Sequence, residues 1–185
     1  NSGIEMGLTF NPLRRTNFTW ESRLNLSTNK NELLSIGELK SPPGILGQAY
    51  GAVQRHRVPD PDGRTYPLGG YWAALPVRDA SGNYVMRTAT AIQFDTVSYI
   101  GPSAPTREIG FSNTLTILRN FRVYALFDYK GGHYLYNYKE FNRCAFNDNC
   151  ARLNEPVFRA STDPADVALK AAYRQASALY IEKAD

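Results

Sequence analysis

The chain has 185 residues, of which 43% are hydrophobic and 21% are charged, and its net charge at neutral pH is +4. This length fits one domain, the composition is too apolar for a disordered chain, and the scattered basic residues predict no nucleic-acid partner. No stretch approaches the roughly 18 continuous apolar residues of a membrane-spanning helix, which excludes a helical membrane protein but not a β-barrel, whose strands are only half apolar.

The first 28 residues predict a β-hairpin with strands at about 3–10 and 17–28. Apolar residues occupy alternate positions in both segments, at Ile4, Met6, Leu8 and Phe10 and again at Phe18, Trp20, Leu24 and Leu26. Period-two alternation is typical of a strand with two different faces, and pairing Phe10 with Phe18 keeps the apolar side chains on one face. The opening residues lack the basic start and apolar run of a signal peptide, so we expect a piece of a longer chain.

A second hairpin is predicted after a long, proline- and glycine-rich connection that covers about 29–106. Its strands fall at about 108–117 and 121–130, and one face of both carries Phe111, Leu115, Ile117, Phe121, Val123, Ala125 and Phe127. A three-residue loop over 118–120 pairs Ile117 with Phe121 and preserves that face, whereas a two-residue loop would mix the faces. Asn120 is expected to take the left-handed conformation that such a loop needs.

Another long connection, about 131–180, follows the second hairpin. Gly131 and Gly132 switch the apolar parity, which predicts a glycine bulge, and tyrosines then recur with period two at Tyr134, Tyr136 and Tyr138. These tyrosines suit an aromatic girdle at a membrane interface or the rim of a binding site; ordinary cross-strand packing is the alternative. Near its end, Asp163 as a cap and Pro164 at the first helical position predict one short loop helix.

The two cysteines, Cys144 and Cys150, are separated by five residues in "CAFNDNC". A small disulfide loop formed in an oxidising compartment fits this spacing, and two free thiols are the alternative. Zinc ligation usually needs a tighter Cys-x2-Cys spacing with further cysteines or histidines, and the chain has only two histidines. We therefore expect no metal site.

The connections run short, long, short, long, which is typical of transmembrane β-barrels with short periplasmic turns and longer extracellular loops. About ten residues per strand also match the membrane thickness. We therefore predict an all-β fold, an antiparallel segment of a large transmembrane β-barrel with four long strands in two hairpins. The seven apolar residues of the second hairpin would face lipid. The alternative is a soluble, secreted β-sandwich that binds carbohydrate and buries that face in a core.

A resemblance to a known family covers most of the chain. Residues 99–144, "YIGPSAPTREIGFSNTLTILRNFRVYALFDYKGGHYLYNYKEFNRC", resemble the C-terminal part of SusC/RagA-like TonB-dependent outer-membrane receptors. "FTWESRLNLSTNKNELLSI" is similar to an earlier strand of these receptors, and "YPLGGYW" is similar to a loop between the two segments. The resemblance implies part of a 22-stranded barrel without its plug domain and without its TonB-contacting segment.

The resemblance implies a role in a bacterial outer-membrane importer of glycans, peptides or similar oligomers. The implied partners are the rest of the barrel and its plug, the TonB–ExbB–ExbD energy-transducing complex, outer-membrane lipid and a SusD-like surface lipoprotein. Loop aromatics that could stack on cargo are Tyr71, Trp72, Tyr134, Tyr136 and Tyr138. The sequence holds no nucleophile elbow, zinc-protease motif, P-loop or dinucleotide fingerprint, so we expect neither an enzyme nor a cofactor.

Overall fold

The computed structural model describes residues 1–35, 45–49, 54–57, 59 and 62–184. Antiparallel sheet predominates, in agreement with the predicted all-β class, although helix accounts for 20% of the chain. In chain order the elements are β1 (Ser2–Arg15), β2 (Phe18–Lys30), β3 (Ile45–Ala49), β4 (Gln54–Arg57), β5 (Gly70–Pro76), β6 (Phe94–Gly101), β7 (Arg107–Ile117), β8 (Phe121–Gly131), β9 (His133–Tyr136), α1 (Tyr138–Ala145), η1 (Ala151–Leu153), α2 (Pro156–Ala160), α3 (Pro164–Gln175), η2 (Ser177–Tyr180) and β10 (Ile181–Ala184).

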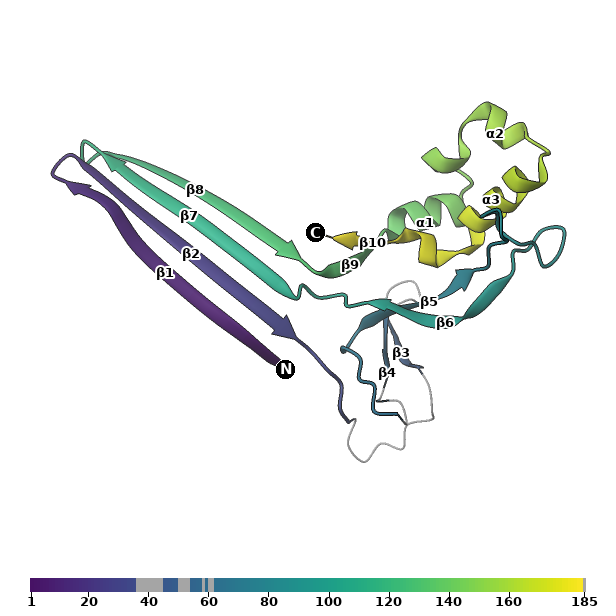
Figure 1. The fold of residues 1–185 in the computed structure, drawn as a ribbon. Helices are drawn as coiled ribbons and strands as arrows, with labels where there is room; N and C mark the ends of the chain where they lie inside the picture. The colour runs from purple at the N-terminus through teal and green to yellow at the C-terminus, as the bar shows by residue number, and fades with distance from the viewer. Residues whose placement is uncertain (36–44, 50–53, 58, 60–61, 185) are drawn as a thin grey trace.

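The four long strands form one antiparallel sheet in the order β1-β2-β7-β8, so β1 and β8 are its edges. Figure 1 shows the two hairpin turns side by side at one end of this sheet and every other element at the opposite end. The short and long connections therefore lie at opposite ends, as predicted from their lengths. The sheet is open, and the described residues contain no closed barrel.

The first hairpin differs from its prediction because β1 continues to Arg15 instead of ending near Phe10. A β-bulge between Phe10 and Leu13 adds one residue to β1 and returns Leu13 to the apolar face, opposite Trp20. The predicted pairing of Phe10 with Phe18 is wrong, since Phe10 pairs with Ser22. The bulge includes a proline, which an edge strand tolerates because its outer N–H groups need no partner in the sheet.

The second hairpin has the predicted register, with Ile117 opposite Phe121 and Leu115 opposite Val123. Its three-residue loop is also confirmed, but the left-handed residues are Leu118 and Arg119, with φ of 51° and 65°, and not Asn120. The backbone N–H of Leu118 donates to the carbonyl oxygen of Asn17 in the neighbouring turn at 2.8 Å. This contact between hairpins cannot be seen from the sequence of one hairpin.

The predicted loop over about 29–106 contains a second sheet with the strand order β3-β4-β5-β6. Its strands are short, and glycines and prolines flank them, so the turn signals outweighed the strand signals in the sequence. Residues 36–44, 50–53, 58 and 60–61 of this predicted loop lie outside the described residues.

The second predicted loop, about 131–180, is largely structured and forms, with β10, a C-terminal lobe (residues 133–184). Strand β9 pairs with β10, and three α-helices replace the single helix that was expected. Helix α3 begins as predicted: Asp163 caps it by accepting from the N–H of Ala165 at 2.8 Å. The predicted bulge is instead a break between β8 and β9, where Gly132 has φ of 73° and a Cβ would collide with Thr106.

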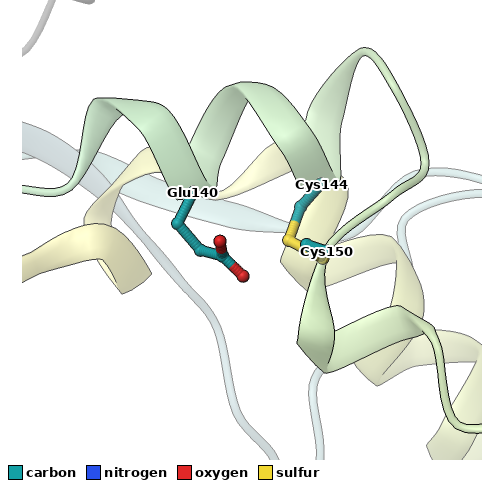
Figure 2. Close-up of side chains that lie close together, drawn as sticks. All are labelled: Glu140, Cys144 and Cys150. Atoms are coloured by element: carbon teal, nitrogen blue, oxygen red, sulfur yellow. A yellow bond between two sulfur atoms is a disulfide. The ribbon is translucent and has the colours of Figure 1, made fainter.

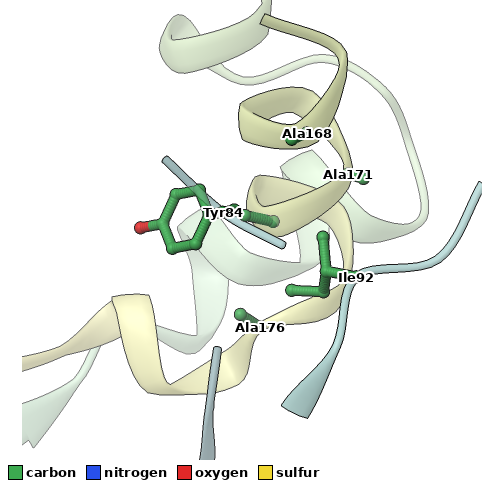
Figure 3. Packing of buried hydrophobic residues seen from close by; sticks show 6 residues of the cluster. Tyr84, Ile92, Ala168, Ala171 and Ala176 are labelled. Carbon is green, nitrogen blue, oxygen red and sulfur yellow. The ribbon is translucent and has the colours of Figure 1, made fainter. Parts of the chain in front are cut away.

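Helix α3 holds the C-terminal lobe against the segment that follows β5. Figure 3 shows the packing: Tyr84 and Ile92 of that segment lie against Ala168 and Ala171 of α3 and against Ala176, the residue that follows the helix. Gln175 fixes the contact, since its Nε2 donates to the carbonyl oxygen of Thr90 at 2.7 Å and its Oε1 accepts from the N–H of Ile92 at 3.2 Å. Small side chains allow this close approach of helix and chain.

Candidate functional site

One face of the four-stranded sheet is apolar across all four strands. The register aligns Leu8, Leu24, Phe111 and Phe127 in one row of the sheet, and Trp20, Leu115 and Val123 in another. All seven residues predicted to face lipid lie on this face: Phe111, Leu115, Ile117, Phe121, Val123, Ala125 and Phe127. We call this surface the apolar face.

The apolar face is exposed. Phe121 and Phe127 each keep 67% of their surface accessible and Val123 keeps 51%, and Ile4, Met6, Leu8 and Phe10 on the other hairpin are exposed as well. A β-sandwich would bury such a face under a second sheet, but within residues 1–35, 45–49, 54–57, 59 and 62–184 no second layer covers it. The predicted sandwich alternative therefore lacks its core in this part of the chain.

The opposite face of the same sheet is polar and charged. Glu21 and Arg23 form an ion pair at 2.9 Å, and Lys130 lies opposite Glu108 at 4.0 Å. Exposed pairs of this kind contribute little stability. They do show that this face is suited to contact with water, so the sheet has one polar face and one apolar face.

A polar group interrupts the apolar face near its centre, and two of its donors are paired within the group. The Oδ1 atom of Asn113 accepts from the hydroxyl of Ser22 at 2.6 Å and from the indole N–H of Trp20 at 2.9 Å. Ser22 is fully buried beneath its neighbours. An unpaired polar group is costly in an apolar solvent, so pairing the hydroxyl and the indole N–H lowers the cost of placing these two donors against lipid.

The five predicted loop aromatics do not form one exposed surface. Tyr71 is buried and packs with Tyr134 and Tyr136 in a hydrophobic cluster below Ile181. Burial raises the pKa of the Tyr136 hydroxyl, with neighbouring tyrosines contributing further. Tyr138 is exposed at the start of α1, where its ring lies 5.8 Å from the Tyr136 ring. Cross-strand packing, the alternative that the sequence left open, describes the tyrosines of β9.

Trp72 belongs to a separate aromatic group that the sequence did not predict. Its ring lies 4.7 Å from Tyr66 and 5.2 Å from Tyr99, and the Arg57 guanidinium lies 5.4 Å from the indole. Burial raises the pKa of the Tyr99 hydroxyl to about 12. Pairing of β5 with β6 sets Trp72 opposite Tyr99, a long-range register that no local pattern reveals.

An open hollow of about 540 Å³ lies beside this aromatic group, lined also by Arg57, Arg64, Thr65 and Ser98. Trp72 and Tyr66 are buried, so the groups that can meet a polar ligand in this hollow are the half-buried Tyr99 ring, the guanidinium groups and the hydroxyls. The hollow has the volume of a small-ligand site, which ranges from about 300 to 1,000 Å³. Of the predicted ligand contacts, only Trp72 lines it.

The cysteines form the predicted disulfide. The sulfur atoms of Cys144 and Cys150 are 2.01 Å apart, and both residues are buried. Figure 2 shows the Glu140 carboxylate beside them, and the ligand atoms of the three residues lie within 4.8 Å of one another. Zinc would need cysteine thiolates, which the disulfide removes, so this group is a structural staple in the oxidised protein.

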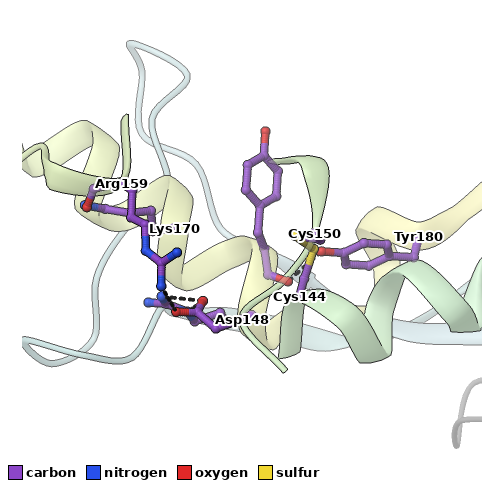
Figure 4. A network of polar contacts seen from close by, with 8 residues as sticks. Cys144, Asp148, Cys150, Arg159, Lys170 and Tyr180 are labelled. Atoms are coloured by element: carbon purple, nitrogen blue, oxygen red, sulfur yellow. Dashed lines mark hydrogen bonds and ion pairs between the residues drawn. A yellow bond between two sulfur atoms is a disulfide. The ribbon is translucent and has the colours of Figure 1, made fainter. Parts of the chain in front are cut away.

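An ion-pair network holds the loop after α1 to helices α2 and α3. Asp148 accepts from Arg174 at 2.7 and 3.1 Å and from Arg159 at 3.4 Å (Figure 4). The Lys170 ammonium group donates to the carbonyl oxygens of Arg159 and Ser161, at 3.2 and 2.7 Å. The hydrogen bond from Arg174 is the largest of the effects that lower the pKa of Asp148 below its usual range.

This lowered pKa predicts an acid-sensitive lobe. The folded state favours ionised Asp148, so this carboxylate adds to the free energy of unfolding. The added stability is complete above the pKa of the unfolded state, about 4, and is lost as the pH falls through the lower pKa of the folded state. Asp148→Asn should cost at most about 1 kcal/mol at pH 7, since the pairs are half exposed. Urea unfolding should show that the difference between wild type and variant shrinks below about pH 4; a constant difference would contradict the assignment.

Comparison with known proteins identifies no relative: the chain matches no family model, and no curated protein matches its sequence. None of the described helices is long and apolar enough to cross a membrane. The apolar face and the hollow beside Trp72 are therefore the features from which function must be argued.

Proposed function

We propose that this chain is part of the wall of a bacterial outer-membrane β-barrel, in a TonB-dependent importer of glycans, peptides or similar oligomers. The observation that carries the proposal is the apolar face, which spans four strands and stays exposed while the opposite face is charged. Large continuous apolar surfaces on a protein mark contact with a membrane or with another protein. Alternation of apolar and polar residues along every strand is the pattern of a barrel between lipid and a wet lumen.

The strand lengths support the same assignment. The long strands have 11 to 14 residues. About 9 to 11 residues in a tilted strand cross the hydrocarbon of a bilayer. The short turns at one end would lie on the periplasmic side. The lobe and the β3-β4-β5-β6 sheet at the other end would then be extracellular, where a disulfide is stable.

The importer class rests on the sequence resemblance described above, together with this separation of short and long connections. In that setting the missing parts of the barrel, the plug and the TonB–ExbB–ExbD complex are the expected partners, and a SusD-like lipoprotein would meet the extracellular elements. The hollow beside Trp72 is our candidate in the described residues for cargo contact, since it combines the half-buried Tyr99 ring with guanidinium groups and hydroxyls. The chain contributes binding and barrel wall, not catalysis.

The two tryptophans allow a direct test, because Trp20 lies on the apolar face and Trp72 is buried at the other end of the molecule. The Trp72→Phe variant leaves Trp20 as the only indole of this chain, and it is refolded into phosphatidylcholine vesicles together with tryptophan-free remaining strands of the proposed barrel, because the edges of an open sheet need partners in lipid. We expect lipids brominated on the acyl chains to quench Trp20, and to leave Trp72 unquenched in the matched Trp20→Phe variant. A folded, monomeric chain in detergent-free buffer whose Trp20 resists quenching would contradict the proposal and favour a secreted carbohydrate-binding protein.

A further inference from the structure

Four arginines gather at the hairpin-turn end of the sheet: Arg14, Arg15, Arg119 and Arg122. All four are exposed, and none forms an ion pair within the described part of the chain. Residues 12–20 and 115–123, which make up this end, include no aspartate or glutamate. The turn end therefore carries a concentrated positive charge, and the nearest carboxylate, Glu21 on the polar face, is paired with Arg23.

The register assigns these arginines to two different sides. Arg15 lies in the last row of the apolar face, in line with Phe18, Ile117 and Phe121. Arg14 and Arg122 lie one row inward on the polar face, separated by Thr19 and Thr116. Arg14 and Arg122 thus lie at the border of the polar face, and Arg15 lies at the border of the apolar face.

Arg119 joins Arg15 at the turn end. It lies in the loop of the second hairpin, and its Nε donates to the carbonyl oxygen of Thr16 in the first hairpin at 3.5 Å. The N–H of Leu118 donates to Asn17 at 2.8 Å, which holds the two turns together. Arg119 therefore contacts the residue that follows Arg15, beyond the last row of the apolar face.

A guanidinium at the border of an apolar surface can extend its charged end to the membrane–water interface while its stem stays in hydrocarbon. There it meets lipid phosphates, and the planar guanidinium fork binds the oxygens of a phosphate group through two parallel hydrogen bonds. Negative lipids attract such residues over a distance of roughly 10 Å, the Debye length at about 0.1 M salt.

We propose that the turn end is a binding site for the phosphate groups of anionic phospholipids, in which Arg15 and Arg119 contact the headgroups from the lipid side. This site rests on the proposed membrane role of the apolar face. The occupant is a phospholipid of the bilayer itself, because the arginines continue the surface that would meet its acyl chains. Arg14 and Arg122 face the lumen side and are not part of the site.

The test compares two double variants that lose the same charge, Arg15→Gln/Arg119→Gln and Arg14→Gln/Arg122→Gln. Each variant also carries Trp72→Phe and is refolded, with tryptophan-free remaining strands of the proposed barrel, in vesicles of phosphatidylcholine alone or mixed with phosphatidylglycerol. Partitioning is read from Trp20 fluorescence. An arginine at an anionic surface adds about fivefold in affinity, so the first variant should lose roughly 25-fold of the preference for phosphatidylglycerol. The second variant should keep most of it.

The outcomes separate this site from the membrane role itself. If Trp20 is quenched by brominated acyl chains but both variants lose the preference equally, the headgroup site is wrong and the apolar face still meets lipid. The same conclusion follows if wild type shows no preference for phosphatidylglycerol. If Trp20 is not quenched, both proposals fail.

Discussion

Leu24→Arg is expected to lower the stability of the bilayer-inserted chain by about 2–4 kcal/mol, the cost of an arginine facing lipid near the bilayer midplane. Leu24 lies on the central strand β2 between Leu8 and Phe111, in an entirely apolar row of the sheet. An arginine there is far from both ends of the strand, so its charged group cannot easily reach water. The measurement is urea unfolding of the proposed barrel that contains the variant chain, refolded in phosphatidylcholine vesicles.

The matched control is Asn25→Arg, one residue further along the same strand. Asn25 points to the polar face, where its cross-strand partners are Gly7 and Gly110, so a long side chain has space. This variant should stay within about 0.5 kcal/mol of wild type, as surface substitutions usually do. Equal destabilisation by both variants would show that the two faces see the same solvent and would refute a lipid-facing surface.

Removing the disulfide, as Cys144→Ala/Cys150→Ala, should destabilise the C-terminal lobe by about 2–3 kcal/mol. Bridging residues six positions apart restricts the unfolded chain, an effect of about 2 kcal/mol for so short a loop. Both cysteines also pack with Leu153 and Tyr180 in a small core, and their truncation leaves space there. The four-stranded sheet should be unaffected, because it lies at the other end of the molecule.

Thermal unfolding followed by the near-ultraviolet dichroism of the lobe tyrosines measures this loss. Dithiothreitol should lower the transition of the wild-type lobe by a similar amount and leave the double variant unchanged. A wild-type lobe that keeps its transition after complete reduction of the bond would show that the disulfide is dispensable for its stability.

The long strands were predictable because each carries its own alternating pattern, and a register that mixes the two faces is recognisably wrong. That reasoning placed Ile117 opposite Phe121 correctly. It failed for Phe10 because the bulge around Pro12 shifts the apolar residues of β1 from even to odd positions. The strand continues past the bulge with its apolar side chains on the same face. A strand that is ended before Pro12 is therefore predicted too short when it lies at the edge of a sheet, where proline is tolerated.

The aromatic hollow and most of the lobe could not be derived from local patterns. Trp72 meets Tyr66 and Tyr99 only through pairings of strands distant in sequence, and the tyrosines after Gly132 read as one strand. The chain instead ends β9 at Tyr136, and Asn137 caps α1 by accepting from the N–H of Glu140 at 3.1 Å. An Asn three residues before Glu was the available signal for a helix start, and the period of the tyrosines obscured it.

The two edges of the long sheet are unequal, and this difference should govern self-association. Strand β1 carries Pro12 and a bulge, which make it a poor template for another strand, whereas the 11 residues of β8 contain neither. Away from lipid, two copies of the chain should therefore pair through β8, and cross-linking sites along β8 should capture this association earlier than sites along β1.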